Sequence, residues 1–381
     1  MAHTWLVACG TALAALAMGY SIMAWLAVRR RIHLTSSTPA FAPPVTVLKP
    51  LCGAEHALYE CLRSFCEQDY PRFQIVFGVS DSRDPAVAVV SRLMREFPSL
   101  DLKIVIDARS HGSSPKVSNL INMMALASYD HFVIADSDVR VTRSYLANVV
   151  APLLDPRVGI VTCCYRGRRR AGLWSLLGCL FINEWFIPSV RVAAMAGSRS
   201  FAFGATIAIR REVLDSIGGF MSIANQLADD YRLGELTRRV GFRTVLSEVV
   251  VDTYVGARNL NELLRHELRW LRTIRAVHPV GHALSFITFG IPVAALGSLL
   301  AGGAFPALAM LGVTAAARLL LHAAVRRPGS ARSHLLIVPL RDTLSFALWS
   351  WSFATRIVRW RNEHFRVTRN GAFQPVARIT Q

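Results

Sequence analysis

Long apolar stretches lie near both ends of the chain, and short apolar runs separate them. Residues 5–28 carry no charged side chain and are followed at once by Arg29, Arg30 and Arg31. About 20 apolar residues span a bilayer. In a cleavable signal peptide the positive charge precedes the apolar run, and here it follows it. We therefore expect an uncleaved transmembrane anchor at 1–31, with the chain after it in the cytoplasm by the positive-inside rule.

A second apolar region lies near the C-terminus. Residues 283–317 carry no charge and are interrupted near the glycines at 302–303, which predicts two spanning helices joined by a tight turn. Residues 335–358 are also apolar but contain an Arg-Asp pair at 341–342. This pair predicts either ionisable residues that face a helix bundle, or a re-entrant or interfacial helix. If the segment spans the membrane, the basic tail at 359–381 lies outside, against the positive-inside rule, and the pattern leaves this open.

Between these regions, short β-rich runs alternate with helical segments. The expected strands are 45–48, 73–79, 102–106 and 132–135, and the expected helices are 55–67, 86–97 and 115–128. Strands separated by helices of this length predict right-handed βαβ units and a mostly parallel, Rossmann-like sheet. No G-x-G-x-x-G follows the first strand, so a dinucleotide site is not expected. Further apolar runs at 159–164, 201–209 and 242–251 extend this domain to about residue 255.

These patterns divide the chain into six parts. They are an anchor (1–31), a Pro/Ser/Thr-rich linker (32–44), an α/β domain (45–255), a juxtamembrane helix (256–280), a C-terminal transmembrane region (281–358) and a basic tail (359–381). Residues 171–190 of the α/β domain repeat leucine and aromatic side chains at helical spacing, directly after three arginines. This arrangement predicts an amphipathic interfacial helix, and an ordinary core helix is the alternative.

Composition narrows the class of protein. The 381 residues are 52% hydrophobic and 18% charged, and 43 Lys and Arg against 25 Asp and Glu give a net charge of +18. A basic excess suits nucleic acid, an anionic membrane surface or an anionic substrate. No zinc finger, RNP motif or helix-turn-helix is visible, so we expect a membrane partner and no nucleic acid. The seven cysteines show no metal-binding spacing, which indicates reduced thiols in a cytosolic domain.

The most informative polar motif is Asp136-Ser137-Asp138, which ends the apolar run at 132–135. Two carboxylates one residue apart can share a hard divalent cation. Such a cation can bridge a diphosphate and stabilise it as a leaving group. The carboxyl ends of parallel strands are where these sheets bind ligands. An isolated D-x-D is also compatible with a solvated turn.

Two further features fall where a nucleotide-sugar site would need them. Asp81 follows the expected strand at 73–79 and can hydrogen-bond a base or ribose, although strand-terminal aspartates are also common in turns. Pro115 begins an expected helix, so Lys116 can lie beside an anion at the helix N-terminus, with Asn119 one turn further on the same side. A surface lysine at a helix start is the alternative.

Later in the chain, Asp229 and Asp230 form an acidic pair, and Arg269 and Trp270 lie just before the C-terminal apolar region. A carboxylate can remove the proton of an acceptor hydroxyl, although either aspartate could instead cap a helix. An arginine can neutralise a departing diphosphate and a tryptophan can line an acceptor pocket. Interfacial anchoring is the alternative for the Arg-Trp pair.

In chain order these residues resemble the D, D-x-D, D, (Q/R)-x-x-R-W series of membrane-bound, inverting GT-A glycosyltransferases. The segments Pro-Lys-Val-Ser-Asn-Leu, Asp-Ser-Asp-Val-Arg and Ala-Asp-Asp-Tyr look like the ceramide glucosyltransferase branch. Within that branch the whole chain looks closest to the bacterial hopanoid-biosynthesis-associated glycosyltransferases. One position departs from the series, since His266 stands where the family has Gln or Arg.

The resemblance implies a lipid glycosyltransferase of the inner membrane, with a cytoplasmic GT-A domain and N- and C-terminal membrane helices. It implies roles for the residues above. The nucleotide sugar would contact Asp81, Lys116, Asn119 and Asp136, and Mg2+ or Mn2+ would bind Asp136 and Asp138. Asp230 (or its neighbour Asp229) would be the base, and Arg269 and Trp270 would lie at the membrane side. The implied donor is UDP-N-acetylglucosamine and the implied acceptor is a hopanoid polyol such as bacteriohopanetetrol, in a bacterial inner membrane. Ceramide with UDP-glucose is the alternative.

Two other functions share parts of this pattern. A processive polysaccharide synthase has the same motifs, but an anchor and about three C-terminal segments are little material for a polymer channel. A non-catalytic membrane adaptor would not need the acidic positions, all of which are filled here.

Overall fold

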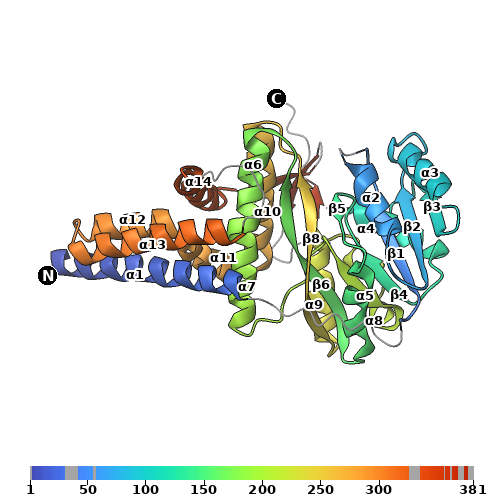
Figure 1. Ribbon diagram of the computed structural model, residues 1–381, viewed down its shortest axis with the longest axis horizontal. Coiled ribbons are helices and arrows are strands. Elements are labelled where there is room, and N and C mark those ends of the chain that lie inside the picture. Colours follow the sequence, from blue (N-terminus) through green and yellow to red (C-terminus); the bar gives the residue numbers. More distant parts are fainter. Residues whose placement is uncertain are drawn as a thin grey trace. The chain divides into compact units, whose positions relative to one another are not determined.

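The chain folds into two compact units. The computed structural model describes residues 2–30, 42–54, 57–325, 335–355, 357–360, 363–367 and 373–375 (Figure 1). The helical unit comprises Met1–Arg31, Arg169–Gly197 and Ala257–Gln381, and the sheet unit comprises Ile32–Arg168 and Ser198–Gly256. The expected linker at 32–44 lies mostly outside the described residues. All seven cysteines are free, as the sequence predicts.

The sheet unit is built on one eight-stranded sheet with the strand order β3-β2-β1-β4-β7-β6-β8-β5. The strands are β1 (Val45–Pro50), β2 (Phe73–Val79), β3 (Asp101–Ile106), β4 (His131–Ile134), β5 (Val139–Arg140), β6 (Val158–Arg169), β7 (Ile207–Arg210) and β8 (Arg243–Val255). β1 pairs in parallel with β2 and β4, and β2 pairs in parallel with β3. The β4–β7, β6–β7 and β5–β8 pairs are antiparallel. The expected α/β class is confirmed, and the antiparallel pairs are an addition that apolar runs alone do not reveal.

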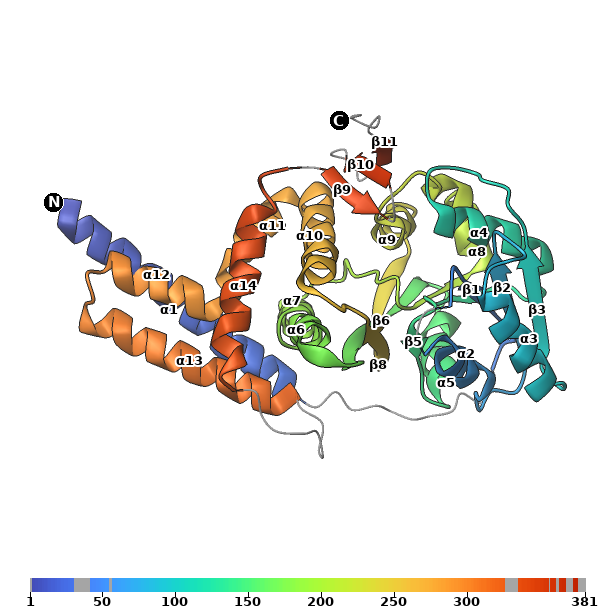
Figure 2. The ribbon, with the colours of Figure 1, turned by 90° about the horizontal axis from the view of Figure 1, so that it is seen from above.

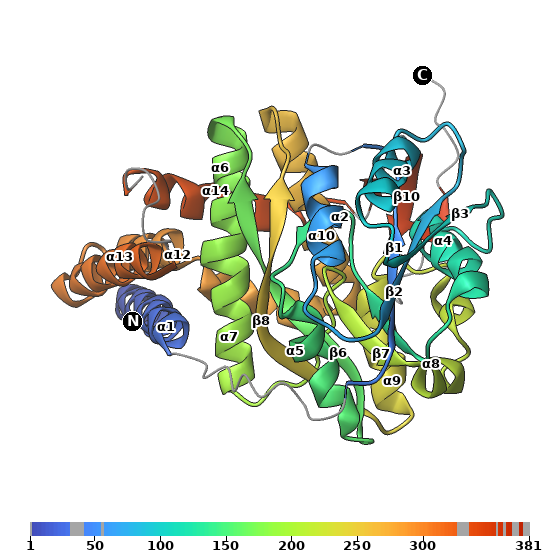
Figure 3. The ribbon, with the colours of Figure 1, turned by 45° about the vertical axis from the view of Figure 1, so that its right-hand side comes forward.

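Helices cover both faces of this sheet (Figure 3). They are α2 (Leu58–Cys66), α3 (Ala86–Glu96), α4 (Pro115–Met123), α5 (Tyr145–Val150), α8 (Arg211–Ser216) and α9 (Asp229–Arg239). Val47 and Phe77 belong to one core, which includes residues of α2, α3 and α5. Leu48 and Val76 belong to a second core, which includes residues of α4, α8 and α9. Both faces of the strands are therefore buried, which explains why β1 and β2 read as nearly continuous apolar runs.

The sheet topology brings the ends of separate strands to one edge. β1, β2 and β4 are parallel neighbours, so their carboxyl ends lie on the same side of the sheet. Asp81 follows the end of β2, and Asp136 follows the end of β4. The helix α4 begins at the same edge, because the strand before it, β3, runs parallel to β2. The fold thus collects residues that are up to 55 positions apart, as the difference between 81 and 136 shows.

The helical unit contains most of the apolar segments. Its helices are α1 (Ala2–Arg29), α6 (Gly172–Phe181), the π-helical turn η3 (Ile182–Phe186), α7 (Ile187–Met195), α10 (Leu260–Val277), α11 (Pro279–Leu284), η5 (Ser285–Thr288), α12 (Gly290–Leu300), α13 (Phe305–Val325) and α14 (Ile337–Trp351). Three short strands, β9 (Ile357–Trp360), β10 (Glu363–Val367) and β11 (Phe373–Pro375), form a separate antiparallel sheet. The sheet begins at residue 357, two residues before the expected basic tail, and continues into it.

The first helix packs within the C-terminal helices. α1 lies beside α12 and α13 (Figure 2). A Cβ atom on Gly297 would lie 2.6 Å from the carbonyl oxygen of Gly10, so the two backbones meet where neither residue has a side chain. Ala14, Ala17 and Ala294 are fully buried around this contact. Small residues at a helix interface allow such close approach, so α1 is a member of the bundle as well as an expected anchor.

Among the residues that the structure describes, three helices are long and apolar enough to cross a membrane: His3–Arg29, Gly172–Met195 and Phe305–Val325. A fourth candidate is the bent pair Pro279–Thr288 and Gly290–Leu300, whose halves meet at 77°. The segment expected as an interfacial helix at 171–190 therefore continues through α7 and reaches spanning length, and its place in the membrane stays a prediction. α14 has 15 residues, fewer than the roughly 20 that span a bilayer.

Candidate active site

Lys116 is the centre of a charged cluster in the sheet unit. Its Nζ lies 2.7 Å from Oδ1 of Asp136 and 3.5 Å from Oδ2 of Asp229. Burial disfavours the ammonium, but the nearby carboxylates outweigh it and raise the pKa of Lys116 above its usual range. The lysine is therefore a permanent cation that links the turn after β4 to the start of α9.

Local sequence explains why Lys116 is presented in this way. Ser114 is the N-cap of α4, and its hydroxyl accepts a hydrogen bond from the backbone N–H of Val117. Pro115 occupies the first helical position, where its missing N–H costs nothing. The cation thus sits in the first turn of a capped helix, where the positive end of the helix dipole favours an anion.

Asp230 is held at the start of α9 by two backbone donors. The N–H of Gly204 donates to Oδ2 at 2.8 Å, and the N–H of Tyr231 donates to Oδ1 at 2.7 Å. The helix-cap position belongs to Ala228, so neither aspartate of the pair caps the helix through its side chain. Burial, and then the charge of Asp229, raise the pKa of Asp230 to about 6. A carboxylate with a pKa this close to neutrality suits a general base.

The pH dependence of any reaction that uses Asp230 as base is expected to follow this pKa. Only the carboxylate form accepts a proton, so log(kcat/KM) should rise with unit slope below pH about 6 and level off above it. Asp229→Asn removes the neighbouring charge and should move the midpoint to lower pH. Initial rates from pH 4.5 to 8.5 measure both midpoints, and a flat profile across that range would contradict the assignment.

Asp138 points into the sheet unit beneath the same turn. Its Oδ2 accepts a hydrogen bond from the hydroxyl of Thr253 at 2.5 Å. Burial, and then the charge of Asp136, raise the pKa of Asp138. A divalent cation would relieve both effects, so the pair fits a hard metal ion. Among the described residues no group of three or more His, Cys, Asp or Glu could hold a metal, so the remaining ligands would have to be diphosphate oxygens and water.

Gly204 faces the cluster, and sequence analysis did not single it out. A Cβ at this position would lie 3.3 Å from Asp230 Oδ2, 3.3 Å from Lys116 Nζ and 3.4 Å from Asp136 Oδ2. The hydrogen of this glycine therefore borders all three charged groups, and a side chain would intrude among them. Its signal in the sequence is weak, because a glycine between Phe203 and Ala205 reads as an ordinary turn.

Lys49 was also missed. It lies in β1 with no exposed surface, its ammonium donates to the carbonyl oxygen of Asp136 at 2.5 Å, and it rests 3.9 Å from the ring centre of Phe65. Burial lowers the pKa of Lys49 to about 8, opposed by the negative charges of Asp136 and Asp138. This hydrogen bond to Asp136 holds the backbone of the D-x-D turn against β1. A single lysine inside an apolar strand was the available signal.

Two other expected residues lie at the same sheet edge with different contacts. Asp81 is half exposed and pairs with Arg83 at 3.0 Å, and these hydrogen bonds lower the pKa of Asp81. Asn119 is buried, and its Nδ2 donates to the carbonyl oxygen of Gly78 at 2.7 Å. Asn119 therefore joins α4 to β2, whereas Lys116 reaches the acidic cluster. Their expected roles with a nucleotide sugar stay predictions.

Arg269 and Trp270 belong to α10 of the helical unit. The Trp270 ring lies 6.2 Å from the ring of Phe181 and 4.9 Å from that of His266. The residue that departs from the expected motif thus contacts the tryptophan of the motif. The structure describes these residues and the acidic cluster each within its own unit, so the membrane-side role of Arg269 and Trp270 stays a prediction.

The mostly parallel sheet has a GT-A type of architecture, with a D-x-D after one strand, a lysine on the preceding helix α4 and an acidic pair at the start of α9. The chain matches glycosyl transferase family 21 over residues 9–373, and it belongs to that family. This result supports the ceramide glucosyltransferase-like resemblance.

Two curated relatives illustrate the match. The chain is 24% identical over 253 residues to ceramide glucosyltransferase 3 of Caenorhabditis elegans, covering 65% of this chain and 54% of that protein. It is 35% identical over 124 residues to ceramide glucosyltransferase of Komagataella phaffii, covering 31% and 24% of the two chains. The chain thus spans about half the length of the first relative and less of the second.

The fold has a solved counterpart. The mannosyltransferase PcManGT from Pyrobaculum calidifontis, solved in complex with GDP-Man and Mn2+, is 24% identical, with a TM-score of 0.59. The similarity covers 91% of this chain and 98% of that one. It establishes the GT-A architecture with accompanying apolar helices.

Proposed function

We propose that the protein is an inverting glycosyltransferase that moves a sugar from a UDP-sugar to a hydroxyl of a membrane lipid. The observation that carries this proposal is the position of Asp230. Its carboxylate is oriented by the N–H of Gly204, next to the Lys116–Asp136 pair that suits a diphosphate. Family membership supports the sugar transfer, and the apolar helices support a membrane-bound acceptor.

The reaction needs one carboxylate and no covalent intermediate. Asp230 accepts the proton of the lipid hydroxyl as the oxygen attacks the anomeric carbon. The new C–O bond forms on the face opposite the breaking bond to the diphosphate, so the configuration inverts. UDP leaves with the electron pair of the broken bond, and the proton remains on Asp230 until solvent removes it.

The departing diphosphate carries the developing negative charge. Lys116 is positioned to bind it, and Lys49 holds the turn that presents Asp136 and Asp138. A divalent ion such as Mg2+ or Mn2+, held by these two aspartates, would neutralise diphosphate charge. By the resemblance, Arg269 adds a further cation.

Two donor–acceptor pairs are candidates for this transfer. The named relatives are ceramide glucosyltransferases, which favours UDP-glucose and a ceramide-like acceptor. The resemblance to hopanoid-associated enzymes favours UDP-N-acetylglucosamine and a hopanoid polyol. We place the ceramide pair first because the comparisons support it, and we keep the hopanoid pair as the second candidate. In either case the sheet unit would act on the cytoplasmic side of the membrane.

A donor-by-acceptor assay on membranes that contain the protein tests the proposal. UDP-glucose and UDP-N-acetylglucosamine are each combined with a ceramide and with a hopanoid polyol, in the presence of Mg2+ or Mn2+. We expect one glycolipid above the level of membranes without the protein, and its loss on addition of EDTA.

The products separate the candidates. Glucosylceramide supports the first pair, and a glycosylated hopanoid supports the second. A long retained polymer would instead support a polysaccharide synthase. Absence of any product from all four pairs, with folded protein in the membranes, would contradict lipid glycosylation.

A further inference from the structure

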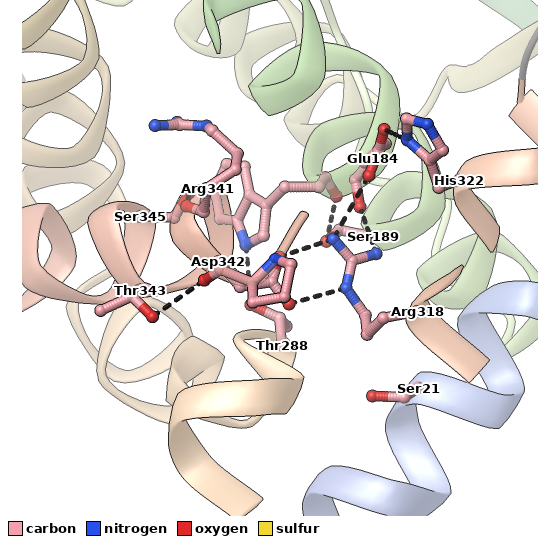
Figure 4. A network of polar contacts seen from close by, with 12 residues as sticks. Ser21, Glu184, Ser189, Thr288, Arg318, His322, Arg341, Asp342, Thr343 and Ser345 are labelled. Carbon is pink, nitrogen blue, oxygen red and sulfur yellow. Dashed lines mark hydrogen bonds and ion pairs between the residues drawn. The ribbon is translucent and has the colours of Figure 1, made fainter. Parts of the chain in front are cut away.

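The helix α14 carries two adjacent charged residues that pair with different helices. Asp342 accepts hydrogen bonds from Nε and Nη2 of Arg318 on α13, at 2.8 and 2.6 Å. Arg341 donates from Nη2 to Oε2 of Glu267 on α10, at 2.6 Å. Figure 4 shows the Arg341 side chain pointing away from the network around Arg318. All four side chains are buried in the helical unit.

The guanidinium of Arg318 is fully paired. Beyond the two bonds to Asp342, its Nη1 donates to the carbonyl oxygen of Glu184 at 3.2 Å. Oε1 of Glu184 in turn lies 2.5 Å from Nδ1 of His322 (Figure 4). Each nitrogen of the Arg318 guanidinium therefore has an acceptor, as a buried arginine requires.

The Glu267–Arg341 pair is incomplete. Nε and Nη1 of Arg341 and Oε1 of Glu267 are buried and have no hydrogen-bond partner in the part of the chain that the structure describes. Leaving one buried polar atom unpaired costs about 1–3 kcal/mol. Arg318, which pairs with Asp342 of α14, has an acceptor for every guanidinium nitrogen, whereas Arg341 of α14 has a single hydrogen bond. This contrast points to a further group that completes the Glu267–Arg341 pair.

An aromatic ring lies beside Arg341, and further rings pack on that ring. The guanidinium of Arg341 lies 5.1 Å from the ring centre of Phe181, which stacks on Trp185 at 4.6 Å. Trp270, the tryptophan of the expected R-W motif, lies 6.2 Å from Phe181. Such rings suit the apolar part of a lipid and strengthen polar contacts by excluding water.

The unpaired atoms define the chemistry of the missing partner. Arg341 offers N–H donors and Glu267 offers an acceptor, so the partner must both accept and donate. The pair is neutral as a whole, and an anion or cation would add an uncompensated charge among apolar helices. A hydroxyl or amide group satisfies both atoms without net charge.

We propose that Glu267 and Arg341 form a subsite for the polar head of a neutral lipid that carries hydroxyl or amide groups. The lipid oxygen accepts from Arg341, and its O–H or N–H donates to Glu267. Phe181 of α6, Glu267 of α10 and Arg341 of α14 meet at this pair, so the head would bind among these three helices. The identification of this lipid as the sugar acceptor rests on the proposed function.

Arg341→Lys tests the subsite. Lysine keeps the positive charge that pairs with Glu267 but lacks the Nε and Nη1 donors. We expect the acceptor KM to rise about tenfold, which corresponds to about 1.4 kcal/mol, while the donor KM changes less than twofold. Binding is measured separately, without donor, as retention of radiolabelled short-chain ceramide or hopanoid polyol by the purified protein in detergent. We expect retention to weaken by a similar factor.

Arg318→Lys is the matched control, because it makes the same substitution at a buried arginine whose guanidinium nitrogens all have acceptors within the protein. It should lower thermal stability and leave the acceptor KM of the folded fraction unchanged. If Arg341→Lys does not fold, Glu267→Gln replaces it. With the amide oxygen of glutamine bonded to Arg341, an NH2 group stands in place of Oε1 and cannot accept the O–H or N–H of the lipid.

The outcomes separate this inference from the proposed function. Equal acceptor KM and equal lipid retention in Arg341→Lys and the wild type would overturn the subsite, and water would then be the partner of the pair. Weakened lipid retention in Arg341→Lys, together with no glycolipid made by the wild type from any donor, would support the subsite and contradict the proposed function. Glycolipid made by the wild type, together with unaltered lipid retention in Arg341→Lys, would support the proposed function and contradict the subsite.

Discussion

Asp230→Asn is expected to lower kcat for sugar transfer about 10³-fold, within the 10²–10⁴ range typical of a lost general base. The amide oxygen of asparagine can still accept the N–H of Gly204 and so hold the loop, although the amide NH2 cannot accept the N–H of Tyr231 as Oδ1 of Asp230 does. Asparagine cannot take the proton of the acceptor hydroxyl near neutral pH. The donor KM should change little. Initial rates at saturating donor and acceptor measure the effect.

Asp229→Asn is the matched comparison, because it changes the adjacent carboxylate in the same turn. Asp229 lies 3.5 Å from Lys116, so its loss should weaken the position of the lysine and lower kcat about tenfold, the scale of one charge-assisted contact. The opposite ranking of the two variants would identify Asp229 as the base. Equal, full activity of both would contradict a catalytic role for the acidic pair.

The second large effect concerns stability. Arg318→Met leaves the carboxylates of Asp342 and Glu184 buried without their shared cation. Removing one partner of a buried ion pair typically costs about 3–5 kcal/mol. We expect the thermal transition of the helical unit to fall markedly in detergent. Fluorescence-monitored melting or resistance to proteolysis measures it.

Two controls make this result specific. Arg318→Met combined with Asp342→Leu removes the unpaired charge and should recover part of the lost stability. Arg63→Met removes an arginine that pairs with Glu96 at the surface, with 40% of the arginine side chain exposed, and should change the melting temperature little. A melting curve for Arg318→Met that matches the one for Arg63→Met would show that the buried network contributes little.

Much of the sheet unit could be predicted because its information is local. Buried parallel strands read as apolar runs, and polar residues at their carboxyl ends mark one edge of the sheet. Asp136 and Lys116 were singled out on this basis, and the structure places them 2.7 Å apart. Their roles in binding and catalysis stay predictions.

The residues that were missed act through the backbone or through distant pairing. Gly204 contributes an N–H and an absence of side chain, and neither leaves a chemical signature in a sequence. Lys49 supports the D-x-D turn only because β1 and β4 are neighbours. The adjacent charges of Arg341 and Asp342 suggested one pair in the sequence. In the structure they form two separate ion pairs, with Glu267 and Arg318, which lie 74 and 24 positions away.

The contact between Gly10 and Gly297 has a consequence for biosynthesis. Chains are made from the N-terminus, and domains generally fold as they emerge. The sheet unit is complete once residue 256 has been made, but α1 gains its closest partner only about 40 residues later, when α12 appears. The first helix therefore spends most of translation with its glycine and alanine face uncovered. A nascent chain that stalls before α12 would present this face to other membrane helices or to quality-control proteases.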